Sequence, residues 1–186
     1  MTPESPPHGF ERVTESRRIH EGRIVNLRED TVDLADGRSA LREVVEHAQV
    51  VAIVPVDDEG NVLLARQYRL PAENALLEIP AGGIDDGESI KDAAQRELQE
   101  ETGYRAERLE RLSGFFVAPG YCTEFIHLFL ATGLSENAIA CDEDEDIVVE
   151  RLPLAQAVGL IAKGEIRDAK SIIGLLLADR QRMESE

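Results

Sequence analysis

A cluster of charged side chains suited to binding a metal ion lies within one short stretch of the chain. Between Gly82 and Tyr104 the sequence reads GGIDDGESIKDAAQRELQEETGY, and its most informative charged residues are Glu88, Arg96, Glu97, Glu100 and Glu101. Carboxylate oxygens are the ligands that Mg²⁺ and Mn²⁺ prefer in proteins. The stretch therefore predicts a site for a hard divalent cation.

A helix is the element that must bring these carboxylates together. Residues 89–102 contain no Pro or Gly and consist mostly of good helix formers. Gly87 precedes this segment and Gly103 follows it, as the start and the end of a helix would require. The sequence therefore predicts a helix from Ser89 to Thr102.

The apolar face of this helix contains two of the glutamates. At about 100° per residue, Ile90, Ala94 and Leu98 form a stripe that should face the core. Glu97 and Glu101 are one turn apart and fall inside the same stripe. Glu100 lies at the edge of that stripe.

A solvated acidic helix is the ordinary interpretation of such a charge pattern, with Arg96 pairing to neighbouring carboxylates. That interpretation does not explain the preceding glycines or the two glutamates in an apolar face. A buried carboxylate is costly unless it is paired or binds a metal ion. We therefore favour the metal site.

The same residues resemble the signature of the Nudix hydrolases, the Nudix box, written GX5EX7REUXEEXGU with U a bulky apolar residue. Every fixed position matches, and only the last U, filled by Tyr104, is slightly unusual. The resemblance implies an α+β protein with the Nudix fold, an α/β/α sandwich in which a mixed β-sheet lies between helices. It also implies hydrolysis of a nucleoside diphosphate linked to another group.

Segments outside the box resemble one subfamily, the ADP-ribose pyrophosphatases. In these enzymes a proline lies sixteen residues beyond the last glycine of the box, and Pro119 occupies that position here. The surrounding FFVAPGYCTE, the REVVEH at residues 42–47 and the RQYR at residues 66–69 are also similar to that subfamily. A Pro-Gly pair by itself would be an ordinary turn, so Pro119 gains its meaning from its register with the box.

The resemblance implies a set of metal ligands and one arginine that orients them. The ligands of two or three Mg²⁺ ions, for which Mn²⁺ can substitute, would be the carbonyl of Ala81 and the carboxylates of Glu97, Glu100 and Glu101. Arg96 would orient these carboxylates, with Glu88 as its ion-pair partner. Arg96 and Glu100 are also expected among the catalytic residues.

The subfamily takes the base that activates water from an acidic loop beyond the box. The run DEDED at residues 142–146 matches that loop. By register we assign Glu143 as the base and Glu145 as an auxiliary metal ligand. A shift of one or two positions stays open because the run is repetitive, as does its interpretation as a solvated charge run.

Substrate contacts are expected from both sides of the box. Arginine side chains suit phosphate and ribose groups, although each could equally be a surface arginine. The residues that we expect to bind substrate are Arg42, Arg66, Arg69, Gly83, Pro119 and Glu124. For adenine stacking, Phe10, Phe116 and Tyr121 are available, and Phe115 or Phe116 is the more natural core residue.

Charge and composition narrow the classes of partner. The net charge of −17 would repel a phosphate backbone, so we expect no nucleic-acid partner. A small anionic substrate is compatible with it, because bound cations invert the local field. We expect no membrane segment or signal peptide and therefore a cytoplasmic protein. Cys122 and Cys141 occur in no zinc-binding pattern, and a disulfide between them stays open.

The chain is expected to divide into a disordered lead at residues 1–10, an N-terminal strand region at 11–48 and a Nudix hydrolase domain at 49–186. Turns at Glu21-Gly22 and Asp36-Gly37 separate three polar strands in the N-terminal region. Such strands cannot form a stable layer alone, so a small antiparallel sheet that forms a homodimer is expected, with swapping between subunits left open. In the main domain we expect strands at 49–56, 61–68, 76–79, 109–117, 125–131 and 147–152 and further helices at 154–162 and 171–182.

The leading hypothesis is a Mg²⁺-dependent hydrolase that cleaves ADP-ribose to AMP and ribose 5-phosphate. One alternative is hydrolysis of other nucleoside diphosphate sugars with broad specificity. Another alternative, of a different class, is a catalytically silent Nudix module that binds nucleotides for regulation. The intact glutamates of the box argue against the silent module.

Overall fold

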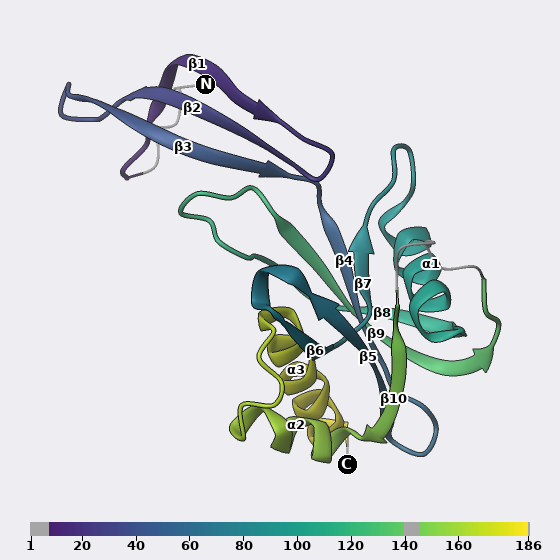
Figure 1. Ribbon diagram of the computed structural model, residues 1–186. Coiled ribbons are helices and arrows are strands. Elements are labelled where there is room, and N and C mark those ends of the chain that lie inside the picture. The colour runs from purple at the N-terminus through teal and green to yellow at the C-terminus, as the bar shows by residue number, and fades with distance from the viewer. Residues whose placement is uncertain (1–7, 140–145, 186) are drawn as a thin grey trace, which may run out of the picture. The chain divides into compact units, whose positions relative to one another are not determined.

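The computed structural model describes residues 8–139 and 146–185 (Figure 1). Its elements are β1 (Arg12–Glu21), β2 (Val25–Asp33), β3 (Ser39–His47), β4 (Val50–Pro55), β5 (Asn61–Arg69), the 3₁₀ turn η1 (Leu70–Ala72), β6 (Asn74–Glu78), β7 (Ala81–Gly83), α1 (Ile90–Thr102), β8 (Tyr104–Phe116), β9 (Phe125–Glu136), β10 (Val148–Pro153), α2 (Leu154–Ala162) and α3 (Ala169–Ser185).

These elements form two compact units. The N-terminal unit contains the described residues up to Ala48 together with Phe116–Glu124, and the main unit contains Gln49–Phe115 and the described residues from Phe125 onward. The loop 116–124 thus belongs to the N-terminal unit, although it lies between two strands of the main unit in the sequence.

The N-terminal unit is an antiparallel sheet in the order β1-β2-β3. Its three strands and the two turns between them confirm the expected small sheet. The loop joins this sheet at β3, where Val45 N–H donates to the carbonyl of Tyr121 at 2.8 Å and Thr123 N–H donates to the carbonyl of Val45 at 3.0 Å. Every residue of β1 is exposed, so this strand has no covering layer among the residues that the structure describes.

The main unit contains two sheets. One is antiparallel, in the order β10-β5-β6, and the other is mixed, in the order β7-β4-β9-β8. In the mixed sheet β4 runs parallel to β9 and antiparallel to β7. The central strand β4 is continuously apolar and fully buried, as its sequence predicted.

Alternate side chains of β4 enter two cores on opposite faces. Ala52 and Val54 pack in a cluster with Leu175 and Ala178 of α3. Val51 and Ile53 pack in a second cluster, whose helical members are Ala93, Ala94 and Leu98 of α1. The period of two along a strand therefore places α1 on one side of the sheets and α2 and α3 on the other, as Figure 1 shows. The α/β/α sandwich with a mixed sheet is confirmed.

Two differences from the sequence-based expectation concern the elements that form the site. Residues 81–83, which are not among the expected strands, form the short strand β7, which pairs with β4 through Ala81↔Ala52 and Val50↔Gly83. Ile90, expected in the buried stripe, is 37% exposed, and Ala93 is buried in its place. Ile90 is the first residue of α1, so the helix begins beyond the core that its later turns reach.

Candidate active site

The helix α1 has defined caps at both ends. The side chain of Ser89 accepts a hydrogen bond from Asp92 N–H at 3.2 Å, which satisfies one free donor of the first turn. Gly103 ends the helix with a positive φ of 78°, and its N–H donates to the carbonyl of Gln99. These caps fix the start of the helix, and so fix which residues of α1 face the sheet.

Two glutamates of α1 are buried beside the mixed sheet, as predicted. Glu97 is 9% exposed and Glu101 is 6% exposed. Glu97 lies against Gly82 of β7, where a Cβ atom would come within 2.2 Å of the carboxylate. The Nudix-like glycine therefore has a steric function, because it leaves the space that the carboxylate occupies.

Arg96 links the glutamates of the site to β7 (Ala81–Gly83), which we call the glycine strand. Its guanidinium donates to Glu88 at 3.0 and 2.9 Å, to Glu97 at 2.5 Å and to Glu100 at 2.9 Å. A further bond reaches the carbonyl of Gly83 at 2.8 Å. All the donors of the guanidinium are thereby used. The predicted ion pair with Glu88 is confirmed, and the hydrogen bonds from Arg96 hold the pKa of Glu88 below its usual value.

A polar cavity of about 310 Å³ opens beside this cluster. Its lining residues are Ala81, Gly82, Gly83, Asp85, Arg96, Glu97 and Glu100. The structure therefore brings together most of the residues that we expected from the box. Glu101 does not line the cavity and lies buried one turn along the same helix.

Two of the expected substrate-binding arginines lie on β5 of the main unit, each with an acidic partner. Arg66 donates to Glu150 of β10 at 2.5 Å. Arg69 donates to Glu78 of β6 through Nε at 3.2 Å and Nη2 at 2.9 Å. The hydrogen bonds to Glu78, and more weakly the charges of Glu78 and Glu101, raise the pKa of Arg69. Arg69 therefore lies in the field of Glu101 of α1.

The remaining expected substrate-binding residues lie in the N-terminal unit. A cavity of about 450 Å³ there is lined by Arg42, Pro119, Phe116 and Tyr121 among others. Arg42 donates to Glu11 at 2.9 and 2.5 Å. Glu124 is half-buried and is not part of the lining. Phe116 is 56% exposed, whereas Phe115 packs on the main core, so Phe115 is the core residue of that pair.

The assigned base Glu143 and the auxiliary ligand Glu145 lie outside the described residues, as does Cys141. Among the described helices, none is long and apolar enough to cross a membrane.

Comparison with known proteins identifies the family. The model of the NUDIX domain matches residues 46–174, which include both the buried glutamates and the cavity. The chain belongs to the Nudix family. A second model, the nucleoside diphosphate sugar hydrolase N-terminal domain, matches residues 11–45, which contain the three-stranded sheet.

Named relatives of this Nudix protein cover nearly its full length. A methanol dehydrogenase activator of Bacillus methanolicus is 40% identical over 89% of this chain and 90% of its own. An ADP-ribose pyrophosphatase of Bacillus subtilis is 38% identical over 87% of this chain and 88% of its own. The crystal structure of an ADP compounds hydrolase superposes with a TM-score of 0.87 at 26% identity, covering 97% of this chain and 98% of the other. The fold is therefore the Nudix fold.

The donor set of this Nudix site fits a hard divalent cation. Glu97 and Glu101 are buried carboxylates on one face of α1, and Gly82 leaves room at the first of them. In the described part of the chain, no three acidic, His or Cys side chains lie close enough to form a complete cage. Magnesium commonly uses one or two protein carboxylates and completes its coordination shell with water and substrate phosphates. The two buried carboxylates are therefore enough protein ligands for such a site.

Some residues of the site gave no signal in the sequence. Asp85 lines the cavity, but it occupies an unspecified position of the box. Lys170 contacts Glu78 at 2.5 Å from a helix more than 90 residues away in sequence. The residues around Lys170, DAKS at 168–171, match no sequence pattern that predicts a contact with Glu78.

Proposed function

We propose that this Nudix hydrolase cleaves the pyrophosphate bond of ADP-ribose and releases AMP and ribose 5-phosphate. The observation that carries the proposal is the pair of buried glutamates, Glu97 and Glu101, beside a polar cavity bordered by the glycine strand. The choice of ADP-ribose is supported by the full-length similarity to an ADP-ribose pyrophosphatase and to an ADP compounds hydrolase.

Four residues would hold Mg²⁺, with Mn²⁺ as a substitute. We assign this role to the carbonyl of Ala81 and the carboxylates of Glu97, Glu100 and Glu101. When bound, the cation would neutralise the charge of the pyrophosphate and make water more acidic. Arg96 orients Glu97 and Glu100 through its hydrogen bonds and holds them near one another despite their like charge.

A carboxylate must still accept the proton of the attacking water. We assign this step to Glu143, with Glu145 as an auxiliary ligand, because the acidic run follows the box as it does in the subfamily. Glu143→Gln should lose activity at neutral pH while its melting temperature stays unchanged. Full activity of that variant would show that the base lies elsewhere.

The anionic substrate needs cationic and apolar partners. Arg69 lies on β5, which packs beside α1, so we assign it to the phosphates, together with Arg66 and the backbone of Gly83. Arg42 and Pro119 of the N-terminal unit are assigned to the nucleoside or ribose, because the cavity that they line also exposes Phe116 and Tyr121. Glu124 is assigned to the ribose from its place after the Pro-Gly turn, although it does not line that cavity. An aromatic face next to an arginine suits a base and its sugar.

We further propose that the protein is a homodimer formed through residues 11–48, a region distinct from the hydrolase domain at 49–186. The support is the strand β1, whose residues are all exposed, and the exposed apolar side chains Val13, Ile24 and Leu41 in that region. Apolar groups on an uncovered sheet favour association with another surface. Size-exclusion chromatography with light scattering tests this, and a monomer at all concentrations would refute it.

A substrate panel tests the activity directly. ADP-ribose, other nucleoside diphosphate sugars and a nucleoside triphosphate are incubated with the protein and Mg²⁺, and the products are resolved by chromatography. We expect ADP-ribose to have the highest kcat/KM, with AMP as a product. A preference for a guanosine sugar would refute ADP-ribose as the main substrate and favour the alternative, a hydrolase of other nucleoside diphosphate sugars. Absence of turnover for all substrates would instead favour the silent nucleotide-binding module.

A further inference from the structure

A buried ionic cluster joins β6 to the start of α3 within the main unit. Its centre is Glu78, the last residue of β6, which is only 4% exposed. Two cations from different elements contact this carboxylate: Arg69 of β5 with two hydrogen bonds, and Nζ of Lys170 at 2.5 Å. A buried carboxylate with two cationic partners is fixed more firmly than one with a single partner.

Lys170 is itself held in place by the first turn of α3. Its Nζ lies 3.0 Å from Asp168 Oδ2, and that oxygen also accepts hydrogen bonds from the N–H and the hydroxyl of Ser171. The Ser171 hydroxyl oxygen accepts from Ile79 N–H at 2.8 Å. The contacts therefore run from Glu78 through Lys170, Asp168 and Ser171 to Ile79, and the peptide bond between Ile79 and Glu78 closes them into a ring.

The position of this ring connects it to the proposed site. Ile79 and Pro80 are the only residues between Glu78 and the strand β7, whose Gly82 lies against Glu97. The carbonyl of Pro80 accepts from Ile53 N–H of β4 at 2.9 Å, which fixes the same segment from the other side. Because this segment has its own anchors, a shift of the Glu78 carboxylate would act mainly on Arg69.

Arg69 keeps donors for a ligand. Its bonds to Glu78 use Nε and Nη2, and Nη1 makes no hydrogen bond to any residue that the structure describes. A guanidinium held on one edge by a carboxylate presents its other edge in a fixed direction. Because β5, the strand that carries Arg69, lies beside α1, that free edge is suited to a phosphate oxygen near α1.

Charge balance explains why the lysine is needed. The cluster contains two carboxylates, Glu78 and Asp168, and two cations, Arg69 and Lys170. Without Lys170 the two carboxylates would have one cation between them, and that cation, Arg69, already lies in the field of Glu101. Arg69 would then be drawn further into the protein, and the local potential would disfavour an anionic ligand.

We propose that Lys170 is a positioning residue, which holds Glu78 and, through Glu78, fixes the guanidinium of Arg69 for contact with the substrate diphosphate. The proposal rests on the proposed function for the identity of the substrate. It assigns Lys170 no contact with substrate, so its effect must pass through Arg69.

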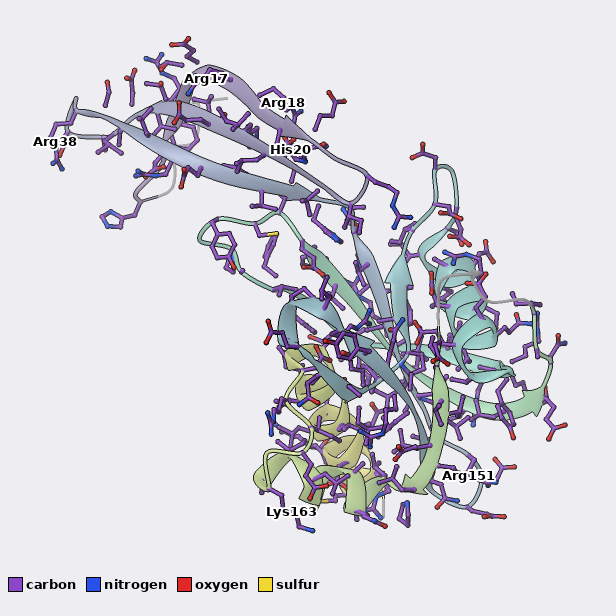
Figure 2. All side chains as sticks on the ribbon, in the orientation of Figure 1. Arg17, Arg18, His20, Arg38, Arg151 and Lys163 are labelled. Carbon is purple, nitrogen blue, oxygen red and sulfur yellow. The ribbon has the colours of Figure 1, made fainter. Side chains whose placement is uncertain are left out.

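Equilibrium binding tests the proposal without relying on turnover. The ligand is the α,β-methylene analogue of ADP-ribose, whose bridging carbon cannot be hydrolysed, titrated calorimetrically in the presence of Mg²⁺. We expect Lys170→Met to weaken binding about tenfold, the scale of one charge-assisted hydrogen bond, and Lys170→Arg to recover most of the affinity. Lys163→Met is the matched control, because Lys163 is exposed and points into solvent from the end of α2 (Figure 2); it should bind as wild type does.

A double-mutant cycle distinguishes positioning from a general loss of stability. If Lys170 acts through Arg69, then Arg69→Met/Lys170→Met should bind no more weakly than Arg69→Met alone. The melting temperature of every variant is recorded, and Lys170→Gln replaces the methionine variant should the latter not fold. Two results would overturn the proposal. One is wild-type affinity for the analogue in Lys170→Met. The other is an equal loss of affinity when Lys170→Met is introduced into the wild-type protein and into Arg69→Met.

The outcomes for Lys170 and for the proposed function can be separated. The wild-type protein could bind the analogue tightly and yet not hydrolyse ADP-ribose. That result would refute the proposed function, but the double-mutant cycle of Arg69 and Lys170 could still be measured by binding. If the wild-type protein did not bind the analogue, there would be no diphosphate contact for Arg69 to make, and the assignment of Lys170 would be refuted as well.

Discussion

Gly82 and Glu97 are in such close contact that the glycine cannot be replaced without moving the carboxylate. A Cβ atom at position 82 would lie 2.2 Å from the carboxyl carbon of Glu97. Because β7 is fixed by its pairing with β4, the flexible end of Glu97 is the part that would give way. The first glycine of the box is therefore a requirement of the buried glutamate on α1.

Gly82→Ala should fold but lose most of its activity. Displacement of a ligand by about 1 Å can lower a rate by about 100-fold, and the loss should be greatest at low Mg²⁺ concentration. The measurement is kcat/KM as a function of Mg²⁺. Gly159→Ala is the control, because an added Cβ there meets nothing within 4 Å. Unchanged metal dependence in Gly82→Ala would contradict the steric interpretation.

Glu101→Gln should separate activity from stability. The substitution keeps the size of the buried side chain, so the melting temperature should stay close to that of the wild type. Activity should fall by more than about 100-fold, since even groups outside the first coordination shell can have effects approaching that size. Kinetics, thermal unfolding and calorimetric Mn²⁺ binding test this, with Glu136→Gln at an exposed position as the control. Retained Mn²⁺ affinity would remove Glu101 from the ligand set.

Arg96→Lys should not replace the native arginine, although the charge is kept. Arg96 makes five hydrogen bonds to four residues, and a lysine has three donors and no planar fork. We expect a loss of stability of about 1–3 kcal/mol and a large fall in kcat. Chemical denaturation and steady-state kinetics measure the two effects. The exposed Arg105 provides a matched Arg→Lys control, and equal behaviour of the two variants would refute the orienting role.

His127 should make stability depend on pH below about 6.5. Burial, and to a smaller extent the charge of Arg111, lowers the pKa of His127 from its usual 6.5. Its Nε2 lies 2.7 Å from Gln49 Oε1, while the buried Nδ1 has no hydrogen-bond partner among the described residues. The folded state therefore favours the neutral ring, and a proton on Nδ1 would lack an acceptor.

The sign of the effect follows from proton linkage. As the pH falls below 6.5, the unfolded chain binds a proton at His127 before the folded chain does, so the contribution present at higher pH is lost as the pH falls through the folded pKa. His127→Gln should reduce the slope of unfolding free energy against pH in that window. An NMR titration of the imidazole provides the direct measurement, and a midpoint above 6.5 would contradict the prediction.

The helix and its buried glutamates could be predicted from sequence because both depend on local spacing. Good helix formers between two glycines define α1, and a period of 3.6 residues places Glu97 and Glu101 on the face of Leu98. The continuous apolar run of β4 similarly predicted a strand covered on both faces. Ile90 was misplaced because periodicity alone does not say at which turn the core begins.

Contacts between distant segments could not be obtained in this way. The partners of Arg69 come from β6, and those of Glu78 come from β5 and α3. Neither pairing leaves a regular interval in the sequence, since strand register and helix packing decide which side chains meet. Residues 116–124 belong to the N-terminal unit for a similar reason, because their backbone contacts with β3 join segments far apart in the sequence.

The sequence by itself determined the class of chemistry: a glycine strand, an orienting arginine and glutamates on a core-facing helix. Those features are encoded within the 23 residues from Gly82 to Tyr104, where helical geometry alone sets the distances. Only the tertiary structure decided how Glu97 fits against Gly82 and how Lys170 and Arg69 share Glu78. The physical reason is that buried charges take their partners from whichever elements the packing of the core brings near them.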